Sequence, residues 1–322
     1  MAKRKTVLIF GVSSFLGSNL AETLKKDYRV IGTYNETPVE IPGVQTHYCD
    51  VLDRDRINFI LLTFRPQYTI YAAGLHSVEL AHTFPKLADA LNTVGLVNVT
   101  KICEKVGSKI CYISSGFVFP GEDVSYSEKD NPLPSTLFGK AKLAGEFFIQ
   151  KSSLNYLIIR SCILYGRGVN HNHRTWFEAL EQNVSDRVIS NLDDRIYAGF
   201  LDVTYLGAVL KLCFDLEVTN RLLQLSSTDI MTHFSFGKLY CKKFNRDDKF
   251  LNKGNWFYPI NDKTGTVMET LKFRLLTENI EDALNISVPS VEESLELTGA
   301  RMNFIPTKEG ERNKKRGTID YL

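Results

Sequence analysis

The stretch TVLIFGVSSFLGSNLAETLKKD, residues 6–27, sets a short apolar run before a glycine-bounded loop and a helical pattern. A continuous apolar run of this length is typical of a strand buried in a parallel sheet. Gly11 and Gly17 bound the loop GVSSFLG, where glycines allow a tight turn and close helix packing. The free backbone N–H groups and the dipole at such a helix start favour a diphosphate. This stretch therefore predicts the first unit of a dinucleotide-binding sheet.

The same rhythm of apolar runs and helical patterns continues as far as Leu164. It predicts an α/β fold, a doubly wound parallel sheet of the Rossmann type with helices on both faces. The expected strands are 6–10, 29–34, 47–51, 68–74, 109–119 and 155–164, with a long amphipathic stretch at 86–107. The pattern breaks after Tyr165, returns as a helix over 201–217, and shows no clear alternation over 228–274.

The break in rhythm predicts a smaller C-terminal substrate domain beside the Rossmann domain. The expected division is 1–166 plus 196–226 for the Rossmann domain, 167–195 plus 227–300 for the substrate domain, and a polar tail over 301–322. Within the smaller domain, 273–299 reads as a short strand, a helix, and a second helix opened by Ser287 and Pro289.

Composition excludes several classes of protein. The 322 residues are 43% hydrophobic and 24% charged, with a net charge of +2, which predicts a packed core and no nucleic acid polymer as partner. The six cysteines form no C-x-x-C pair, so we expect free thiols and a cytoplasmic location. No apolar run approaches a membrane span. The pair of histidines in HNH, 171–173, has no evident third ligand, so we expect no metal site.

The end of the second expected strand, GTYNETP at 32–38, leaves the cofactor open between NAD and NADP. No acidic residue stands at the strand tip for a ribose 2′-OH, and no Arg or Lys stands there for a 2′-phosphate. Tyr34 and Asn35 are the candidates. Asp50 has two open interpretations: a contact to the adenine amino group, or the N-cap of the helix that follows.

Six segments in order carry a family resemblance. They are YAAG (71–74), ADALNTVGLVNV (88–99), ISSGFVFPGE (113–122), LFGKAKLAGE (137–146), IIRSCILYG (158–166) and NISVPSVEESLE (285–296). Together with the glycine loop they resemble the extended short-chain dehydrogenase/reductase family, and within it the dTDP-4-dehydrorhamnose reductase group. Two departures stand out: Ser14 replaces the middle glycine of the loop, and Phe138 stands at the position of the catalytic tyrosine.

The resemblance implies roles for particular residues. The catalytic set is Ser115, Lys142, Asn92 and Phe138, the last at the tyrosine position. The cofactor-binding set is Gly11, Ser13, Ser14, Phe15, Leu16, Gly17, Asn35, Asp50, Val51, Ala72, Ala73, Gly74 and Lys142. The substrate-binding set is His76, Ser115, Asn172 and Arg174. We expect His76 to line the pocket, with a catalytic role as the alternative. Tyr126 does not match the family's catalytic position.

The missing hydroxyl at position 138 leaves four interpretations open. In the family, a tyrosine gives a proton to the carbonyl oxygen and a lysine one helical turn later lowers the tyrosine's pKa. General acid catalysis of this kind contributes roughly 10²- to 10⁴-fold. Phe138 is a natural loss in a binding protein, a sign of another proton source, an engineered Tyr→Phe change, or a core residue of a structural helix.

The function implied is NAD(P)-dependent reduction of a nucleotide-linked 4-keto-6-deoxysugar in polysaccharide precursor synthesis, impaired by Phe138. Two alternatives remain: a non-catalytic NAD(P)-binding regulatory or scaffold subunit of the same fold, and a nucleotide-sugar epimerase or dehydratase. The last needs further acid–base residues that the sequence does not show. A homodimer is also expected.

Overall fold

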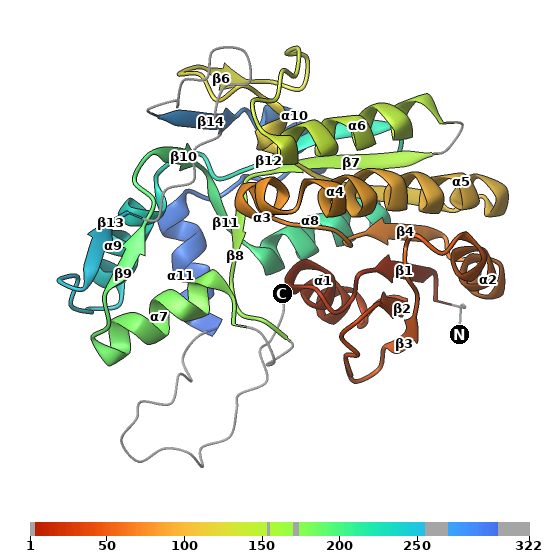
Figure 1. Cartoon of the computed structure of the whole chain (residues 1–322), viewed down its shortest axis with the longest axis horizontal. Helices are drawn as coiled ribbons and strands as arrows, with labels where there is room; N and C mark the ends of the chain where they lie inside the picture. The colour runs from red at the N-terminus through yellow and green to blue at the C-terminus, as the bar shows by residue number, and fades with distance from the viewer. Residues whose placement is uncertain (1–3, 153–154, 170–173, 255–269, 302–322) are drawn as a thin grey trace.

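A seven-stranded parallel sheet forms the centre of the computed structural model, which describes residues 4–152, 155–169, 174–254 and 270–301 (Figure 1). The strand order is β12-β7-β5-β4-β1-β2-β3. The strands are β1 (Thr6–Phe10), β2 (Arg29–Tyr34), β3 (Gln45–Tyr48), β4 (Tyr68–Tyr71), β5 (Lys109–Ser115), β7 (Tyr156–Ser161) and β12 (Arg221–Leu225). Register fixes β1 between β2 and β4, with Val7 opposite Val30 and Tyr68.

Helices cover both faces of this sheet because alternate strand residues point to opposite sides. Val7 and Ile9 pack in a cluster with α1 (Phe15–Leu24), α8 (Val203–Asp215) and α10 (Glu278–Leu284). Leu8 and Phe10 pack on the other face with α2 (Arg54–Phe64) and α5 (Leu96–Val106). Helix α6 (Leu137–Lys151) contributes Ile149 to that second face. The predicted doubly wound fold is confirmed.

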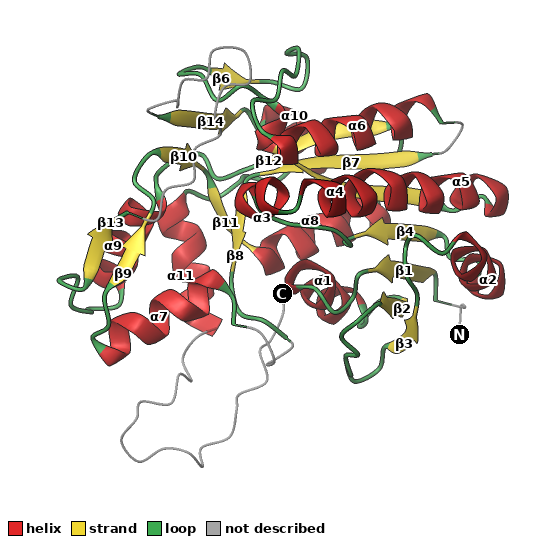
Figure 2. Cartoon of the chain, in the orientation of Figure 1, coloured by secondary structure: helices red, strands yellow, loops and turns green. Residues whose placement is uncertain are grey.

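A second cluster of aromatic side chains lies beyond the sheet. It includes Tyr165, Phe177, Phe200 and Phe236. The elements around it are α7 (Trp176–Asp186), α9 (His233–Lys243), α11 (Val291–Arg301) and the paired strands β8 (Ile163–Tyr165) with β11 (Phe200–Asp202) and β9 (Ser190–Leu192) with β13 (Leu251–Lys253). Figure 2 shows this group of helices and short strands beside the large sheet. The exact domain division stays a prediction.

Several expected boundaries differ from the structure. The third strand is β3, which ends at Tyr48 rather than at Val51. The stretch 86–107 is divided into α4 (Pro85–Asp89), a π-helical turn η1 (Ala90–Gly95) and α5. The region 228–274, which shows no clear alternation in the sequence, contains α9 together with β13 and the start of β14 (Leu271–Leu275), which overlaps the short strand expected from residue 273. These short strands are set by tertiary pairing, as β14 lies between β10 (Ile196–Ala198) and β6 (Ser125–Tyr126).

The last helix begins later than expected. Helix α11 starts at Val291, and the Ser290 hydroxyl accepts a hydrogen bond from the Glu293 amide at 3.2 Å. Ser290, rather than Ser287 and Pro289, therefore starts this helix. The expected tail overlaps α11 at Arg301, and residues 302–322 lie outside the described residues.

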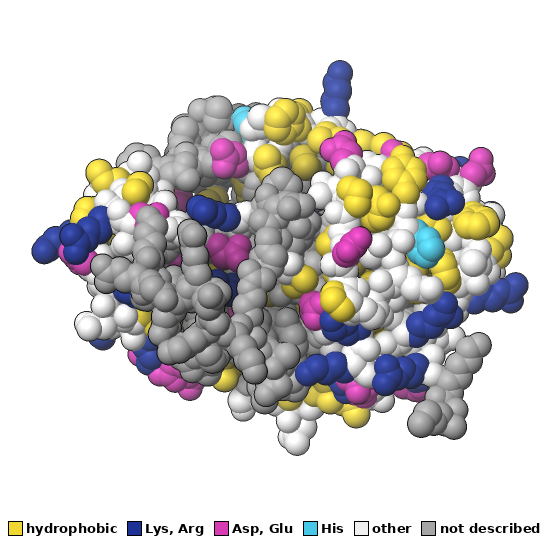
Figure 3. Space-filling model, turned by 90° about the horizontal axis from the view of Figure 1, so that it is seen from below, with side chains coloured by type: hydrophobic (Ala, Val, Ile, Leu, Met, Phe, Trp, Pro, Cys, Tyr) yellow, Lys and Arg dark blue, Asp and Glu magenta, His cyan; other side chains and the backbone are white. Residues whose placement is uncertain are grey.

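Charged side chains of both signs are interspersed on the face seen in Figure 3.

A buried ion pair ties α6 to the sheet. Arg160 of β7 donates to both carboxylate oxygens of Glu146, from Nη2 at 2.7 Å and from Nε at 3.0 Å. The Ser114 hydroxyl donates to the same carboxylate at 2.5 Å. Glu146 is 1% exposed and Arg160 3% exposed. Because both charges are removed from water, the attraction between them is needed to offset the cost of their desolvation.

Arg160→Met is expected to lower the free energy of unfolding by roughly 3–5 kcal/mol, because Glu146 then remains buried without its cation. Urea denaturation monitored by circular dichroism measures the loss. Glu217→Gln is the matched control, since it breaks the exposed Lys5–Glu217 pair and is expected to leave the midpoint nearly unchanged. Equal shifts in the two variants would contradict the role given to the buried pair.

Candidate active site

The predicted site residues gather at one edge of the large sheet. Its strands are parallel, so their carboxyl ends meet there, and ligands of such sheets bind outside that edge. The loop 11–17 follows β1, Asn35 follows β2, residues 72–77 follow β4, and Ser115 ends β5. Sequence segments that are far apart in the chain are therefore brought to one edge of the sheet.

The glycine loop is held by close backbone packing. Gly11 has a φ of +87°, and a Cβ on it would lie 2.7 Å from the Ala73 nitrogen. A Cβ on Gly17 would lie 2.2 Å from the Gly11 carbonyl oxygen. Neither position accepts a side chain without moving backbone. Such a tight turn, ending at the start of α1, fits the diphosphate of a dinucleotide.

Ser14, at the place of the middle glycine, caps helix α1. Its hydroxyl accepts a hydrogen bond from the Gly17 amide at 3.0 Å and lies 2.8 Å from the Gly11 carbonyl oxygen, to which it donates. The side chain therefore bonds to the loop's own backbone. A phosphate at this loop would meet backbone N–H groups, and the serine is compatible with the fold. Ser13, Phe15 and Leu16 are half-buried around it.

The residues expected near the adenosine differ in their exposure and in their hydrogen bonds. Asn35 is exposed at the end of β2. Asp50 accepts a hydrogen bond from the Leu52 amide at 2.9 Å, whereas Asp53 accepts from the Arg56 amide and is the N-cap of α2. The N-cap interpretation of Asp50 was wrong, because the helix starts one turn later. Val51 is buried in the core, and its carbonyl accepts from Asn98.

Asn92 fixes the loop after β4. Its Nδ2 donates to the Leu75 carbonyl at 3.0 Å, and a Cβ on Gly74 would lie 1.9 Å from its Oδ1. Asn92 lies in the π-helical turn η1, a feature often found at functional sites. Within the described parts of the chain, its buried Oδ1 has no hydrogen-bond partner. Ala72 and Ala73 are half-buried between this loop and Gly11.

Lys142 points at the end of β5. Its Nζ donates to the Ile113 carbonyl at 2.9 Å, two residues before Ser115. Its ammonium lies 4.9 Å from the ring centroid of Tyr112. Burial lowers the pKa of Lys142 to about 8, and the Glu146 carboxylate opposes this shift. Ser115 is 9% exposed, and its hydroxyl accepts from the Phe117 amide at 3.3 Å.

Phe138 lies beside this lysine but also belongs to a hydrophobic cluster. The Lys142 ammonium is 5.6 Å from its ring centroid. The ring is 6% exposed and packs with Ala81 and Ala88, from α3 (Val78–Thr83) and α4. Position 138 is thus both next to the candidate catalytic lysine and covered by neighbouring helices. It offers no hydroxyl to the groove.

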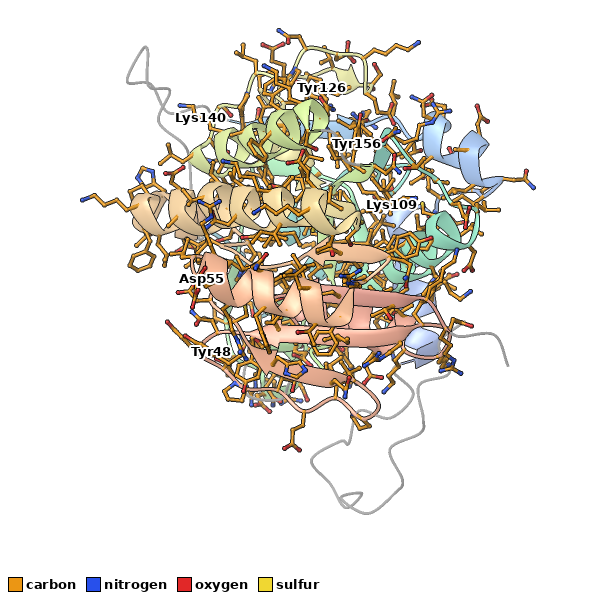
Figure 4. The ribbon with its side chains drawn as sticks, turned by 90° about the vertical axis from the view of Figure 1, so that its right-hand side faces the viewer. Tyr48, Asp55, Lys109, Tyr126, Lys140 and Tyr156 are labelled. Atoms are coloured by element: carbon orange, nitrogen blue, oxygen red, sulfur yellow. The ribbon has the colours of Figure 1, made fainter. Side chains whose placement is uncertain are left out.

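The remaining candidates divide clearly. His76 is exposed. Two effects lower its pKa, of which partial desolvation is the larger and the positive charge of Lys142 the smaller. Arg174 is exposed directly before α7, and no described contact ties it to the other site residues. Asn172 lies outside the described residues. Tyr126 is on β6 at the top of the molecule in Figure 4, stacked on Phe119, and its hydroxyl accepts from the Glu122 amide at 2.7 Å.

Sequence reasoning missed the carboxylate of Glu146 and its partner. Glu146 follows Lys142 by four residues, a spacing that places both on one helix face and could have drawn attention to it. Its partner Arg160 lies on strand β7, and no local pattern in the sequence indicates that the two residues pair. Among the described residues, no cluster of His, Cys, Asp or Glu could hold a metal ion, and no helix is long and apolar enough to cross a membrane.

A known family matches most of the chain. The family model of the RmlD substrate binding domain matches residues 5–298. The chain belongs to this family. The match confirms the resemblance to the dTDP-4-dehydrorhamnose reductase group, and it covers both the large sheet and the helices beyond it.

Curated relatives include two kinds of protein. Methionine adenosyltransferase 2 subunit beta of Bos taurus is 32% identical over 117 residues, which is 36% of this chain and 35% of that protein. The same subunit of Xenopus tropicalis is 25% identical over 72% of this chain and 67% of that protein. The probable low-salt glycan biosynthesis reductase Agl14 of Haloferax volcanii is 28% identical over 49% of this chain and 53% of that protein. The bovine match thus spans about a third of its relative's length.

Solved structures confirm the fold. A dTDP-4-dehydrorhamnose reductase from Bacillus anthracis, in complex with NADP, has a TM-score of 0.76 at 21% identity, covering 92% of this chain and 99% of that one. UDP-glucose 4-epimerase from Thermotoga maritima, with UDP-glucose, has a TM-score of 0.76 at 20% identity, covering 91% of this chain and 97% of that one. At these identities the likeness concerns the architecture.

Lys142 is expected to titrate near pH 8, well below Lys243, whose pKa the carboxylates of Glu296 and Glu292 raise above 10.5. Two-dimensional NMR of the ¹³C-dimethylated protein resolves both titrations, and Lys142→Arg assigns the signal. Because the folded pKa is depressed, the stability difference between this protein and Lys142→Met should shift in favour of the lysine form as pH rises from about 8 towards 10.4. A midpoint above 10 for Lys142 would contradict the buried placement.

Proposed function

We propose that the chain is an NAD(P)-dependent reductase of a nucleotide-linked 4-keto-6-deoxysugar, slowed by the loss of the hydroxyl at position 138. One observation carries the proposal: Lys142 donates to the carbonyl of Ile113, so its ammonium lies at the strand end that carries Ser115. This pair shares the sheet's carboxyl edge with the closely packed glycine loop. Membership of the RmlD family supports the same class of chemistry.

The cofactor, when bound, supplies the hydride. Backbone N–H groups of the loop 11–17 would hold its diphosphate, and the Lys142 ammonium would hydrogen-bond the ribose next to the nicotinamide. The Ser115 hydroxyl would hydrogen-bond the substrate's carbonyl oxygen and orient it. Phe138 gives its ring to the hydrophobic cluster and no proton to the reaction. Both NAD and NADP remain candidates, since the tip of β2 carries neither an acidic residue nor a cation at Asn35.

A second candidate is a non-catalytic NAD(P)-binding regulatory subunit. The burial of Phe138 favours it, because a position that has joined the core no longer needs to face a substrate. Several curated relatives are subunits of methionine adenosyltransferase 2. The epimerase or dehydratase alternative has less support, because the predicted catalytic and substrate-binding residues include neither a tyrosine nor a carboxylate.

Phe138→Tyr is expected to raise kcat for reduction by roughly 10- to 10²-fold, because it adds a general acid beside Lys142. Oxidation of NADH and of NADPH is followed at 340 nm with a panel of nucleotide-linked 4-keto-6-deoxysugars. Phe117→Tyr is the matched control, since its ring packs against that of Phe138 in the same cluster.

Cofactor binding by isothermal titration calorimetry separates the candidates. If neither form oxidises either cofactor while both forms bind one, the reductase proposal is wrong and the regulatory one is supported. If neither cofactor binds, both are wrong.

We also propose that the chain acts as a cytoplasmic homodimer. All six cysteines are free thiols, which supports a reducing compartment. Helix α6 contacts the segment formed by α4 and η1, and both carry exposed apolar residues. An exposed charged residue of α6, Lys140, lies among them in the sequence. The apolar residues are Phe84, Leu87 and Val94 before α5, and Leu137 and Phe147 on α6. A second copy packing on this face would cover them.

Phe147→Asp is expected to convert the dimer to a monomer, because a charge at a 50% exposed apolar position has little effect on the fold but is costly in an interface. Sedimentation velocity gives the mass of each form. Phe59→Asp is the control, at a comparably exposed position on α2. A monomeric unmodified chain would contradict the proposal.

A further inference from the structure

A reduction at this site needs a proton that residue 138 cannot give. Two tyrosines of the adjoining strands β5 and β6 do not replace it. Tyr112 is 1% exposed, and burial raises its pKa well above the ordinary value. Tyr126 belongs to a separate hydrophobic cluster with Val118, Phe119 and Leu275, and its hydroxyl already accepts from the Glu122 amide. Lys142 donates to a carbonyl and is expected to hold the cofactor.

His76 lies on the short loop that covers residue 138. The residue before it, Leu75, and the second one after it, Val78, both pack against the cluster that contains Phe138. The loop is fixed on both sides of the histidine. Asn92 donates to the Leu75 carbonyl, and the Ser77 hydroxyl accepts from the Leu80 amide at 3.1 Å as the N-cap of α3. The imidazole is therefore presented from a rigid segment.

Exposure distinguishes His76 from its neighbours. The Phe138 ring is buried, whereas the His76 side chain is exposed at the carboxyl edge of the sheet. Leu75, the residue before His76, packs against the cluster of Phe138, and the Lys142 ammonium lies 5.6 Å from the Phe138 ring centroid. Other charged or titratable groups on the adjoining helices are Glu79 and His82 on α3, Lys86 and Asp89 on α4, and Lys140, Glu146 and Lys151 on α6. Glu146 is engaged by Arg160, so Lys142 is the charge that acts on the histidine.

We infer that His76 donates the proton to the substrate's carbonyl oxygen, in place of the hydroxyl missing at position 138. This inference rests on the proposed reductase function. As the carbonyl carbon receives a hydride, the π electron pair of the C=O bond moves to the oxygen. That oxygen takes the proton of the imidazolium and becomes a hydroxyl. Neutral imidazole remains and is protonated again from water, so charge and electrons balance.

The direction of the pH dependence follows. Desolvation and the Lys142 charge hold the pKa of His76 below 6.5. The imidazolium is therefore the minor form at pH 7, and kcat for reduction falls as pH rises through that pKa. Oxidation of the corresponding alcohol needs the neutral imidazole as a base, so its kcat rises over the same interval. Phe138→Tyr should remove this dependence from both directions.

His76→Gln is tested in two backgrounds. In the unmodified sequence it should lower kcat for reduction about 10²-fold, because the general acid is lost. In the Phe138→Tyr background it should lower kcat less than about threefold, because the tyrosine then supplies the proton and the two changes are not additive. His82→Gln, on the exposed side of α3, is the control.

An independent readout follows the histidine itself. NMR titration of the imidazole signals should give His76 a pKa below 6.5, and Lys142→Met should raise it, because the repelling charge is removed. Calorimetric cofactor binding by His76→Gln should be unchanged, which would show that the variant is folded and that the groove is intact.

Four results would overturn the inference. They are equal losses for His76→Gln in both backgrounds, no loss in the unmodified sequence, no change of the His76 pKa in Lys142→Met, and turnover by Phe138→Tyr but not by the unmodified sequence. The last result leaves the proposed reductase function standing. Absence of turnover in every variant, with cofactor bound, removes the reductase function and the role of His76 together.

Discussion

The hydrogen bond from the Lys142 ammonium to the Ile113 carbonyl is the contact on which the site depends. It joins helix α6 to strand β5 at Ile113, two residues before Ser115. Behind it, Glu146 and Arg160 hold the same helix against β7 with a buried bidentate ion pair. A cation in this position is costly to bury, which is why its pKa falls to about 8. The surrounding hydrogen bonds compensate for that cost.

The glycine loop is a second constraint, and it is one of shape. Gly11 and Gly17 are required because backbone atoms occupy the space that side chains would need. Ser14 shows that the middle position tolerates a residue whose hydroxyl can serve as a helix N-cap. The departure from the usual glycine pattern is therefore absorbed locally. The departure at position 138 is of another kind, since it changes which atoms the groove can offer to a reaction.

The family provides the framework in which these residues are interpreted. The chain belongs to the RmlD substrate binding domain family, whose model covers almost all the described elements. Within that framework Phe138 and His76 lie on neighbouring segments, one turned into the core and the other exposed. The proposed route of the proton through His76 follows from this arrangement. The curated relatives include both a probable reductase and subunits of methionine adenosyltransferase 2.

The amino-acid sequence by itself determined the large sheet, its helical layers and the glycine loop, because continuous apolar strands and helical periodicity are local patterns. It also indicated Ser115, Lys142 and Asn92, through motifs that survive in order. Only the tertiary structure decided what Phe138 packs against, that Asp53 rather than Asp50 caps α2, and that Arg160 pairs with Glu146. It likewise decided the strand β13, which exists through pairing with the distant strand β9. Side-chain burial and pairing between remote segments depend on the whole fold, and no local window of sequence contains them.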